Sequence, residues 1–324
     1  MSVNTPRIAC HYADQKIVGR NDGGPLYHCH ELRKLFGKEN VLHVFPGDKR
    51  TDLGKFDLNY WVDWGEDAFG WTDFVCPKPN VYITSDTHLG FDYRLKMART
   101  MDFVFCNQRK AMVDFVLNGI PEDKCFWLPH GYSPLAYNKG VFIPSKNMWD
   151  LNAEPIKKYD ICFVGNLNDE NRVRHLDVLF KKFPNSYWCT RRFHEAAEVF
   201  NQSKIVFNVS SRKELNMRHF EALGAGAFLL TDNIPTEENV FTEGVHFAGY
   251  DNLDDMVDKA AYYLANDAKR DEISRAGYIE AMQKHTYAHR VLAVLDTMGI
   301  KYDPAVAASM LPNLHEQVKE PIAA

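Results

Sequence analysis

Short apolar runs of strand length alternate with segments of helical periodicity along the first part of the chain. The helical segments are residues 26–36, 93–99 and 110–117, and residues 52–73, which have no clear period, are expected to hold a strand and loops. Runs this uniformly apolar, each followed by a helix, are typical of parallel strands covered on both faces. The runs are RIACHY (7–12), VLHVF (41–45), NVYITSD (80–86), DFVFCN (102–107) and the start of CFWLPHGYSP, a strand expected to end at His130.

The same alternation begins again at residue 159 and continues almost to the end of the chain. Its apolar runs are YDICFVG (159–165), SYWCT (186–190), KIVFNVS (204–210), AFLLTD (227–232) and VHFAGY (245–250). The helices predicted with these runs span 173–182, 194–202, 213–223, 253–265, 267–284 and 287–297.

Two such series predict an α/β protein with two Rossmann-like, doubly wound domains that face a cleft. Residues 139–158 contain Pro and Asn and have no period, so they are the best candidate for a linker. We therefore expect an N-terminal domain at 1–140 and a C-terminal domain at 155–300. A C-terminal helix or tail at 301–324 is expected to pack back toward the N-terminal domain.

Composition narrows the class of protein without identifying its function. The length of 324 residues is enough for about two domains. Apolar residues make up 45% and charged residues 25%, which excludes collagen-like and disordered classes. The net charge of −5 does not favour general binding to nucleic acid or to an anionic membrane.

Neither an apolar run of about 18 residues nor a signal-peptide pattern occurs, so we expect a cytoplasmic protein without membrane insertion. The seven cysteines are scattered, with no CxxC pair, and are expected to be buried, reduced thiols.

Ligands of doubly wound sheets bind outside the carboxyl ends of the strands, so the loops after the strands are the candidate sites. In the N-terminal half, Gly23 and Gly24 of the NDGGP segment would let the backbone approach a ligand at a helix N-terminus, or would serve a simple turn. Asp86 and His88 follow an apolar strand and can serve a reacting centre, since histidine titrates near neutral pH. The alternative for this segment is a cap on the next helix.

Two further loops lie in the C-terminal half. Gly165 and Asn166 end an apolar run, and Arg172 or Arg174 in the helix that follows can bind phosphate oxygens bidentately. The alternative is that these arginines are simply exposed to solvent.

The segment NVSSRKELNMRHFEALGAGAFLLTDN (208–233) is the most informative. Ser211 and Glu214 have the spacing of a capping box. Glu221 lies in the apolar part of the predicted helix, where a carboxylate needs a partner. A pair with Arg218, one turn earlier, is the structural alternative to a functional role.

The segment RHFEALGAGAFLLTD resembles the nucleotide-sugar-binding helix of GT-B glycosyltransferases of the group 1 type. Within that group the chain is most similar to the CgeB/YkvP-like, spore-protein-like branch. The resemblance covers most of the chain, and besides the Gly-Gly loop it includes YITSDTH, MDFVFC, WLPHGYSP, YDICFVGNL, NQSKIVFNVS and RDEISRAGYIEAMQKHTYAHRV.

This resemblance implies retaining transfer of a sugar from a nucleoside diphosphate sugar, a UDP-sugar first among them, to a hydroxylated acceptor. Glu221 would hold the ribose hydroxyls, and Arg218 or Arg172 would neutralise the diphosphate. Ser210 and Ser211 would face the diphosphate, and Thr190 and Arg191 would border the base. The other residues assigned to the donor are Asn216, Gly165 and Asn166 in the C-terminal half, and Gly23 and Gly24 in the N-terminal half. The implied catalytic candidates are His88, Asp86 and Arg218.

The chain departs from the family pattern at one position. In the related retaining enzymes a first glutamate lies eight positions before the second, and Lys213 occupies that position here, with Glu214 one residue further on. No DxD sequence occurs, so we expect no bound metal and no other cofactor. Arginines and helix N-termini would then stabilise the leaving diphosphate.

Two other functions remain open, a GT-B-fold sugar-nucleotide epimerase and a non-catalytic binding or coat-associated protein with a decayed site. The acceptor is expected to be a carbohydrate or a small hydroxylated molecule. Hydroxymethylated viral DNA is the alternative acceptor, although the net charge of −5 counts against it. A DNA groove would need basic residues along it, and exposed helix faces are the plainer interpretation of the basic clusters. Those clusters are Lys96 with Arg99, Arg109 with Lys110, and Arg191 with Arg192.

Overall fold

The structure is a computed structural model, and it describes residues 5–12, 23–45, 51–63, 76–210, 212–235 and 239–312. The described residues divide into two compact units. Those up to His130, together with Tyr287–Leu311, form unit 1, and those of Gly131–Thr286, together with Pro312, form unit 2. Each unit is an α/β structure with its own parallel sheet and its own apolar core.

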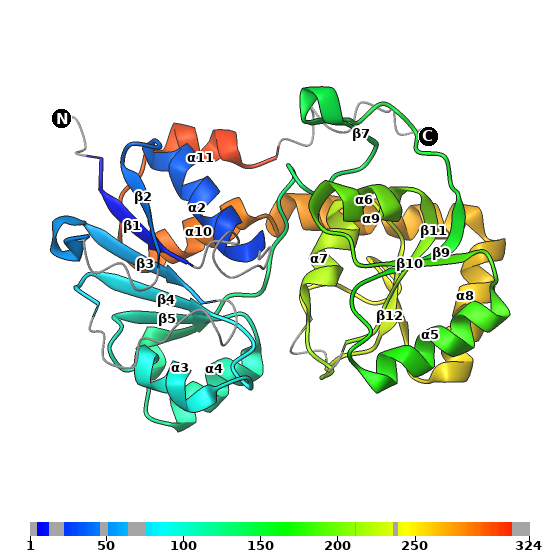
Figure 1. The fold of residues 1–324 in the computed structure, drawn as a ribbon, viewed down its shortest axis with the longest axis horizontal. Coiled ribbons are helices and arrows are strands. Elements are labelled where there is room, and N and C mark those ends of the chain that lie inside the picture. The colour runs from blue at the N-terminus through cyan, green and yellow to red at the C-terminus, as the bar shows by residue number, and fades with distance from the viewer. Residues whose placement is uncertain are drawn as a thin grey trace. The chain divides into compact units, whose positions relative to one another are not determined.

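The described part of unit 1 is built on six parallel strands in the order β2-β1-β3-β4-β5-β6 (Figure 1). The order reverses beside β1, which pairs with β2 on one side and with β3 on the other. Doubly wound sheets bind ligands at such a reversal, outside the carboxyl ends of the strands. The strands are β1 (Ile8–His11), β2 (Val41–Val44), β3 (Leu58–Val62), β4 (Asn80–Thr84), β5 (Phe103–Cys106) and β6 (Cys125–Trp127).

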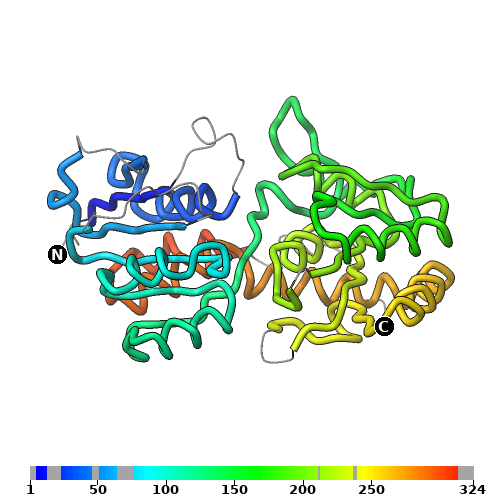
Figure 2. The backbone as a smooth tube through the Cα atoms, turned by 60° about the horizontal axis from the view of Figure 1, so that its bottom comes forward, coloured from blue at the N-terminus to red at the C-terminus, as the bar shows by residue number. Residues whose placement is uncertain are grey.

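Helices cover both faces of this sheet. On one face, α2 (Gly23–Phe36), α10 (Tyr287–Thr297) and α11 (Pro304–Met310) share a core with β1, β3 and β4. On the other face, α3 (Phe91–Ala98) and α4 (Arg109–Leu117) pack against β3, β4 and β5. Figure 2 shows that α10, from the end of the chain, lies beside α2, from its beginning. Burial on both faces is the reason that these strands are mostly apolar, rather than alternating between apolar and polar residues.

Unit 2 contains, among its described residues, five parallel strands in the order β10-β9-β11-β12-β13. Here the order reverses beside β9, which pairs with β10 and with β11. The strands are β9 (Tyr159–Val164), β10 (Ser186–Cys189), β11 (Ser203–Asn208), β12 (Leu229–Asp232) and β13 (Ala248–Tyr250).

The sheet of unit 2 is also covered on both faces. Helices α5 (Glu170–Lys182) and α8 (Leu253–Ala265) share a core with β9, β11 and β12. The helices α6 (Phe193–Asn201) and α7 (Met217–Gly224) pack on the opposite face, and α9 (Asp267–Lys284) packs against α7 and α8 (Figure 1).

The alternation of strands and helices predicted from the sequence is confirmed. Each apolar run contains a strand of one of the two parallel sheets, and the helices predicted at 253–265, 267–284 and 287–297 have these bounds in the structure. Of the segment 52–73, the structure describes residues up to 63, which form a 3-10 turn, Leu53–Lys55, and β3. Further 3-10 turns are Glu122–Lys124 and Pro144–Lys146.

The predicted start of the helix at 213–223 is wrong. Lys213 has a φ of +57°, a left-handed conformation that a right-handed helix does not include, and α7 begins only at Met217. The side-chain oxygen of Asn216 caps the helix by accepting a hydrogen bond from the backbone N–H of Arg218 at 3.1 Å.

The predicted capping box is wrong as well. Glu214 precedes the helix and pairs with Arg212 at 3.4 Å, so it does not occupy the third helical position that a capping box requires. Ser211, its predicted partner, lies outside the described residues.

The units change at residues other than the domain boundaries expected from the sequence, which were 1–140, 155–300 and 301–324. Residues 139–158 belong to unit 2, where they form a hairpin of β7 (Val141–Ile143) and β8 (Met148–Asp150) that contacts α6. The helix α10 belongs to unit 1 because its apolar side chains complete the core under α2. The helix α11 also packs on α2.

All seven cysteines lie in the described part of the chain as free thiols, and each is buried except Cys189, which is partly buried. In the part of the chain that the structure describes, no helix combines the length and the apolar character needed to cross a membrane.

A pair of leucine substitutions tests the place of α10 in unit 1. Leu295 in α10 is 0% exposed, whereas Leu117 at the end of α4 is 78% exposed. Leu295→Ala should lower the free energy of unfolding by about 2–5 kcal/mol, because it removes buried apolar surface and leaves a cavity. Leu117→Ala should change it by less than about 0.5 kcal/mol.

Urea denaturation measures both effects, and hydrogen exchange locates them. The strands of unit 1 should lose protection in Leu295→Ala. Lost protection in unit 2 alone would contradict the assignment of α10 to unit 1.

Candidate functional site

The reversal of strand order in unit 2 lies beside β9, and most residues predicted for the donor site surround it. Because β9 and β11 are parallel, the loops that follow them leave the same edge of the sheet. The first loop begins with Gly165 and Asn166, and the second contains Ser210. Helices α5 and α7, which follow these loops, contribute Arg172 and Arg218.

Arg172 organises the loop after β9. It lies in the first turn of α5, where its backbone N–H donates to the capping carboxylate of Asp169 at 3.1 Å. Its Nη1 reaches back to the carbonyl oxygen and the side-chain Oδ1 of Asn166, at 2.9 and 3.0 Å. The guanidinium also lies over the ring of Phe163, 5.4 Å from its centre. These contacts hold the cation at the carboxyl end of β9.

Arg218 reaches the same strand end from α7. Its Nη2 donates to the carbonyl oxygen of Val164, the last residue of β9, and its Nη1 donates to Oε2 of Glu221 at 2.7 Å. The intrahelical pair that the sequence left open as a structural alternative is therefore present. Among the described residues the pair uses one carboxylate oxygen, so Oε1 of Glu221 keeps its capacity to accept hydrogen bonds from a ligand.

Two guanidiniums lie near one strand end of unit 2, together with the carboxylates of Glu221, Asp169 and Asp232. Burial lowers the pKa of Arg172, and the charge of Arg218 acts in the same direction, while Asp169 and Asp232 oppose it. A site that holds two cations together favours an anion that accepts hydrogen bonds from both of them. Among the described residues, no group of three or more His, Cys, Asp or Glu side chains is placed to hold a metal ion.

Asp232, at the end of β12, was missed by the sequence analysis. Its side chain is 1% exposed. One carboxylate oxygen accepts the backbone N–H of Ser210 and the other accepts the Ser210 hydroxyl, both at 2.7 Å, and Nζ of Lys213 lies 3.1 Å from the second oxygen. Ser210 therefore has no proton left to donate to a phosphate oxygen. The sequence did contain a signal for Asp232, because this residue ends an apolar run in the same way that Asp86 ends the run NVYITSD.

The side chain of Asn216 is also occupied within the protein. Its Oδ1 accepts from the backbone of Arg218 and from Nδ1 of His219 at 3.2 Å, and its Nδ2 donates to Asn208 at 3.3 Å. Burial lowers the pKa of His219 to about 4, so this imidazole is neutral at pH 7 and carries its proton on Nδ1. Asn216 thus positions the start of α7, which carries Arg218 and Glu221.

Thr190 and Arg191, predicted to border the base, are exposed and follow β10, the neighbour of β9 in the sheet. The loop after β9 is joined to this strand by Trp188, whose indole N–H donates to the carbonyl oxygen of Gly165 at 2.7 Å. Trp188 is 42% exposed, and an exposed tryptophan beside these residues was not anticipated from the sequence.

The remaining predicted residues lie in unit 1, on two separate elements. Gly23 and Gly24 are buried at the start of the described α2, which follows β1. Asp86 and His88 follow β4, and β3 lies between β1 and β4 in the sheet. His88 is exposed, whereas Asp86 is partly buried and has a φ of +48°. Asn21 and Asp22 of the NDGGP segment, like Ser211 of the donor set, lie outside the described residues.

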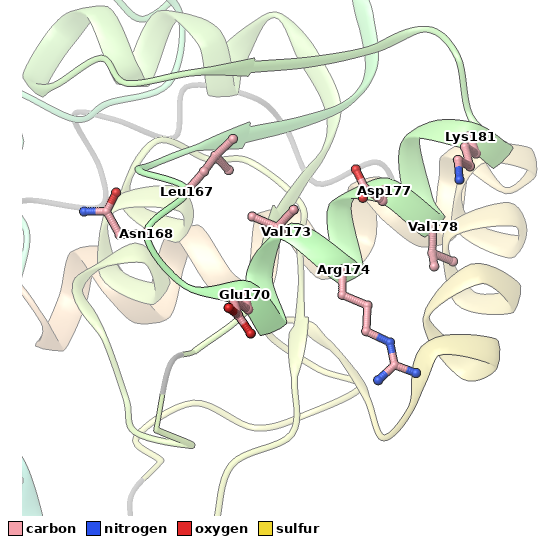
Figure 3. A pocket seen from close by; sticks show the side chains of 8 residues that line it. All are labelled: Leu167, Asn168, Glu170, Val173, Arg174, Asp177, Val178 and Lys181. Atoms are coloured by element: carbon pink, nitrogen blue, oxygen red, sulfur yellow. The ribbon is translucent and has the colours of Figure 1, made fainter.

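A hollow of about 370 Å³ lies along α5 (Figure 3). Arg174, which the sequence analysis considered beside Arg172, lines it together with the charged side chains of Glu170, Asp177 and Lys181. Arg172 does not line this hollow, and the two arginines serve different surfaces of α5. The lining residues are Leu167 and Asn168 from the loop after β9, and Glu170, Val173, Arg174, Asp177, Val178 and Lys181 from α5.

Residues 156–296 match a protein family described as glycosyl transferase-like. The match runs from just before β9 into α10, and it includes both arginines and Glu221. A comparison with curated proteins found no match.

Solved structures share the fold at low sequence identity. HepE from Anabaena, in complex with UDP and glucose, has a TM-score of 0.63 and 13% identity over 91% of this chain and 99% of HepE. A Listeria monocytogenes protein described as a UDP-N-acetylglucosamine 2-epimerase has a TM-score of 0.52 and 13% identity over 93% of this chain and 98% of its own. Sucrose-phosphate synthase from Thermosynechococcus elongatus has a TM-score of 0.50 and 11% identity, covering 75% and 73%.

These likenesses confirm the predicted fold class. The chain has an α/β fold with two doubly wound parallel sheets, and it matches the structures of GT-B glycosyltransferases.

The role of Asp232 in the loop after β11 leads to a stability prediction. Asp232→Asn replaces one acceptor oxygen with an NH2 group that faces existing donors, so it should lower the free energy of unfolding by about 1.5–3 kcal/mol. Asp160→Asn is the matched control, because Asp160 forms a surface pair with Lys204 at 2.8 Å and its side chain is 28% exposed. It should cost no more than about 1 kcal/mol.

Urea denaturation compares the two variants, and hydrogen exchange should rise at the Ser210 amide only in Asp232→Asn. Equal losses of stability would mean that the buried carboxylate does not hold this loop.

Proposed function

We propose that the protein transfers a sugar from a nucleoside diphosphate sugar to a hydroxylated acceptor, without a bound metal ion. The observation that carries the proposal is the grouping of Arg172, Arg218 and Glu221 at the strand-order reversal of unit 2. This grouping lies inside the residues that match the glycosyl transferase-like family. Within the group 1 glycosyltransferases, we assign the chain to the CgeB/YkvP-like branch on the motifs quoted from its sequence.

Each group at the site has a definite role in this reaction. The guanidiniums of Arg172 and Arg218 would hold the diphosphate and stabilise the charge that develops on it as the bond to the sugar breaks. Glu221 would accept hydrogen bonds from the ribose hydroxyls through Oε1. Thr190 and Arg191 would border the base. A UDP-sugar is the first candidate because structures of HepE contain UDP and UDP-glucose.

The residues of unit 1 complete the proposal. Asp86 and His88 would serve the reacting centre and the acceptor, and Gly23 and Gly24 would let the backbone of α2 approach the donor sugar. Retention at the anomeric carbon is the outcome that we propose, although Lys213, at the position of the family's first glutamate, pairs with Asp232. Nuclear magnetic resonance of the product's anomeric proton decides between retention and inversion.

A thermal-shift screen with UDP-, GDP-, ADP- and TDP-sugars tests the donor. A ligand that binds only the folded state adds about 2.7 kcal/mol of stability at 100 times its Kd, so a true donor should raise the melting temperature clearly. The shift and any slow donor hydrolysis should persist in EDTA. If no nucleotide sugar shifts the melting temperature, the non-catalytic alternative is favoured.

The substitution Glu221→Gln separates a binding role from a structural one. It removes a charge-assisted hydrogen bond to the ribose, which should weaken nucleotide binding by about 1.5–3 kcal/mol, or about 10- to 150-fold. The amide oxygen still accepts from Arg218, so the melting temperature should change little. Calorimetric titration with the best donor from the screen measures the affinity. Unchanged affinity with a sharp fall in melting temperature would show that the pair with Arg218 is purely structural.

An epimerase is the second candidate, favoured by the likeness to the Listeria protein. The two reactions differ in their requirement for an acceptor. An epimerase would release a rearranged sugar from the donor alone, whereas a transferase alone with its donor would release the unchanged sugar slowly by hydrolysis. Chromatography of the sugar released from a labelled donor distinguishes them.

We propose a carbohydrate or a small hydroxylated molecule as the acceptor, and hydroxymethylated viral DNA as the alternative. The net charge of −5 leaves the protein without a general attraction for phosphates. We therefore expect no retention of plain or hydroxymethylated duplex DNA in a mobility-shift assay near physiological salt. Salt-dependent binding at micromolar or lower concentrations would make DNA the first candidate.

A further inference from the structure

A buried ion pair lies at the carboxyl edge of the sheet in unit 1. Asp63 directly follows β3, which pairs with β1, the strand where the order reverses. Its backbone N–H donates to the carbonyl oxygen of Ile83 in β4 at 2.8 Å and so continues the sheet. Arg94 lies in α3, on the face of the sheet that α3 and α4 cover. The two side chains are 1% and 0% exposed, and Nε of Arg94 lies 2.6 Å from Oδ2 of Asp63.

Three donors converge on that one carboxylate oxygen. Besides Arg94, the hydroxyl of Tyr82 donates to Oδ2 of Asp63 at 2.6 Å and the hydroxyl of Thr84 at 3.2 Å, both from β4. Burial raises the pKa of Asp63, and Arg94 and the Tyr82 hydroxyl oppose that shift. The network therefore ties the ends of β3 and β4 to the first turn of α3.

The network is not optimised for stability. Oδ1 of Asp63 and Nη2 of Arg94 are buried and have no hydrogen-bond partner among the described residues, and the same holds for the hydroxyls of Ser85 and Tyr93. Buried ion pairs with unsatisfied atoms contribute little net stability compared with apolar side chains of similar volume.

The pair holds one particular loop, the turn from residue 85 to residue 90 that joins β4 to α3. Nη1 of Arg94 donates to the carbonyl oxygen of Leu89. Leu89 also closes the turn, because its backbone N–H donates to the carbonyl oxygen of Asp86 at 2.8 Å. Asp86 is held with a φ of +48°, a conformation that costs energy for a residue with a side chain.

We propose that Asp63 and Arg94 are positioning residues that fix the 85–90 turn and thereby orient Asp86 and His88 toward the reacting groups. This inference rests on the proposed function, which assigns Asp86 and His88 to the reacting centre. Arg94 is suited to the task because its planar guanidinium carries donors in fixed directions. Nε faces Asp63 while Nη1 faces Leu89, and a lysine ammonium at the end of a flexible stem would not hold both partners in the same geometry.

Two variants and one control test the proposal. Arg94→Lys keeps the positive charge but lacks the planar guanidinium that reaches both Asp63 and Leu89. The double variant Asp63→Asn with Arg94→Met removes both charges, so neither is left buried alone and the fold should be retained. Arg99→Lys is the control, because Arg99 follows α3, is exposed, and its guanidinium donates to the carbonyl oxygen of Asn118 at 3.2 Å, away from the 85–90 turn.

The first readout is hydrogen exchange at the Leu89 amide, and it does not depend on activity. In both Arg94 variants this amide should exchange at least 10-fold faster, while the amides of β1 and β3 and those of unit 2 keep their wild-type rates. Unchanged exchange at Leu89 in a folded variant would overturn the proposal. Faster exchange throughout unit 1 would also overturn it, because the pair would then support the fold in general.

The second readout is sugar transfer with the donor found in the screen. The Arg94 variants should lose at least 10-fold in kcat while the KM for the donor changes less than twofold, and Arg99→Lys should match the wild type. A loss confined to the donor KM would contradict a role at the reacting centre. If the wild-type protein transfers no sugar, the proposed function fails, and the exchange at Leu89 still decides whether the pair fixes the turn.

Discussion

A single constraint, the common direction of the strands within each large sheet, places every polar group of the candidate site. Successive parallel strands need a crossover between them, and a helix forms it after β4, β9 and β11, for example, where it also buries a face of the sheet. All strands of such a sheet then end at one edge. Residues far apart in the sequence, such as Arg172, Arg218 and Asp232, come close enough for their charges to interact for this reason.

The two units use a buried aspartate in the same way. Asp63 in unit 1 and Asp232 in unit 2 each end or directly follow a strand, and each accepts several hydrogen bonds. Those of Asp63 come from β4 and α3, and those of Asp232 come from the loop after β11. Such a carboxylate costs free energy to bury, and its hydrogen bonds offset that cost only when the surrounding loop keeps one conformation. In both units the left-handed residue of the neighbouring loop, Asp86 or Lys213, is close to this network.

The sequence was sufficient to predict the fold because the fold depends on patterns that extend over many residues. Each apolar run became a strand, and the last long helices had the predicted bounds. The start of α7 could not be predicted, because Ser211 and Glu214 have a spacing that suits a cap. The left-handed Lys213 instead pairs with Asp232 of a later strand, and Asn216 caps the helix.

The candidate site was predictable only in part, for a similar physical reason. Arg172, Arg218 and Glu221 were identified from residue type and position, and the structure brings them to one strand end. Periodicity carries no information about which side chain accepts a hydrogen bond across a sheet, so Asp63, Arg94 and Asp232 were not anticipated. Ser210 and Asn216 were predicted to bind the donor from their residue types, but their side chains form hydrogen bonds with other residues of the chain.

Unit 1 is built from two separate stretches of the chain, and this has a consequence for folding during synthesis on the ribosome. The sheet of unit 2 and the helices that cover it come from one stretch, Gly131–Thr286, whereas the core of unit 1 also needs α10 and α11, which are synthesised after that stretch. Until these helices emerge, the face of the first sheet that they cover exposes apolar side chains of β1 and β3 to water and to other nascent chains. Unit 1, whose first strands are synthesised before unit 2, can therefore complete its core only after α10 and α11 have been synthesised.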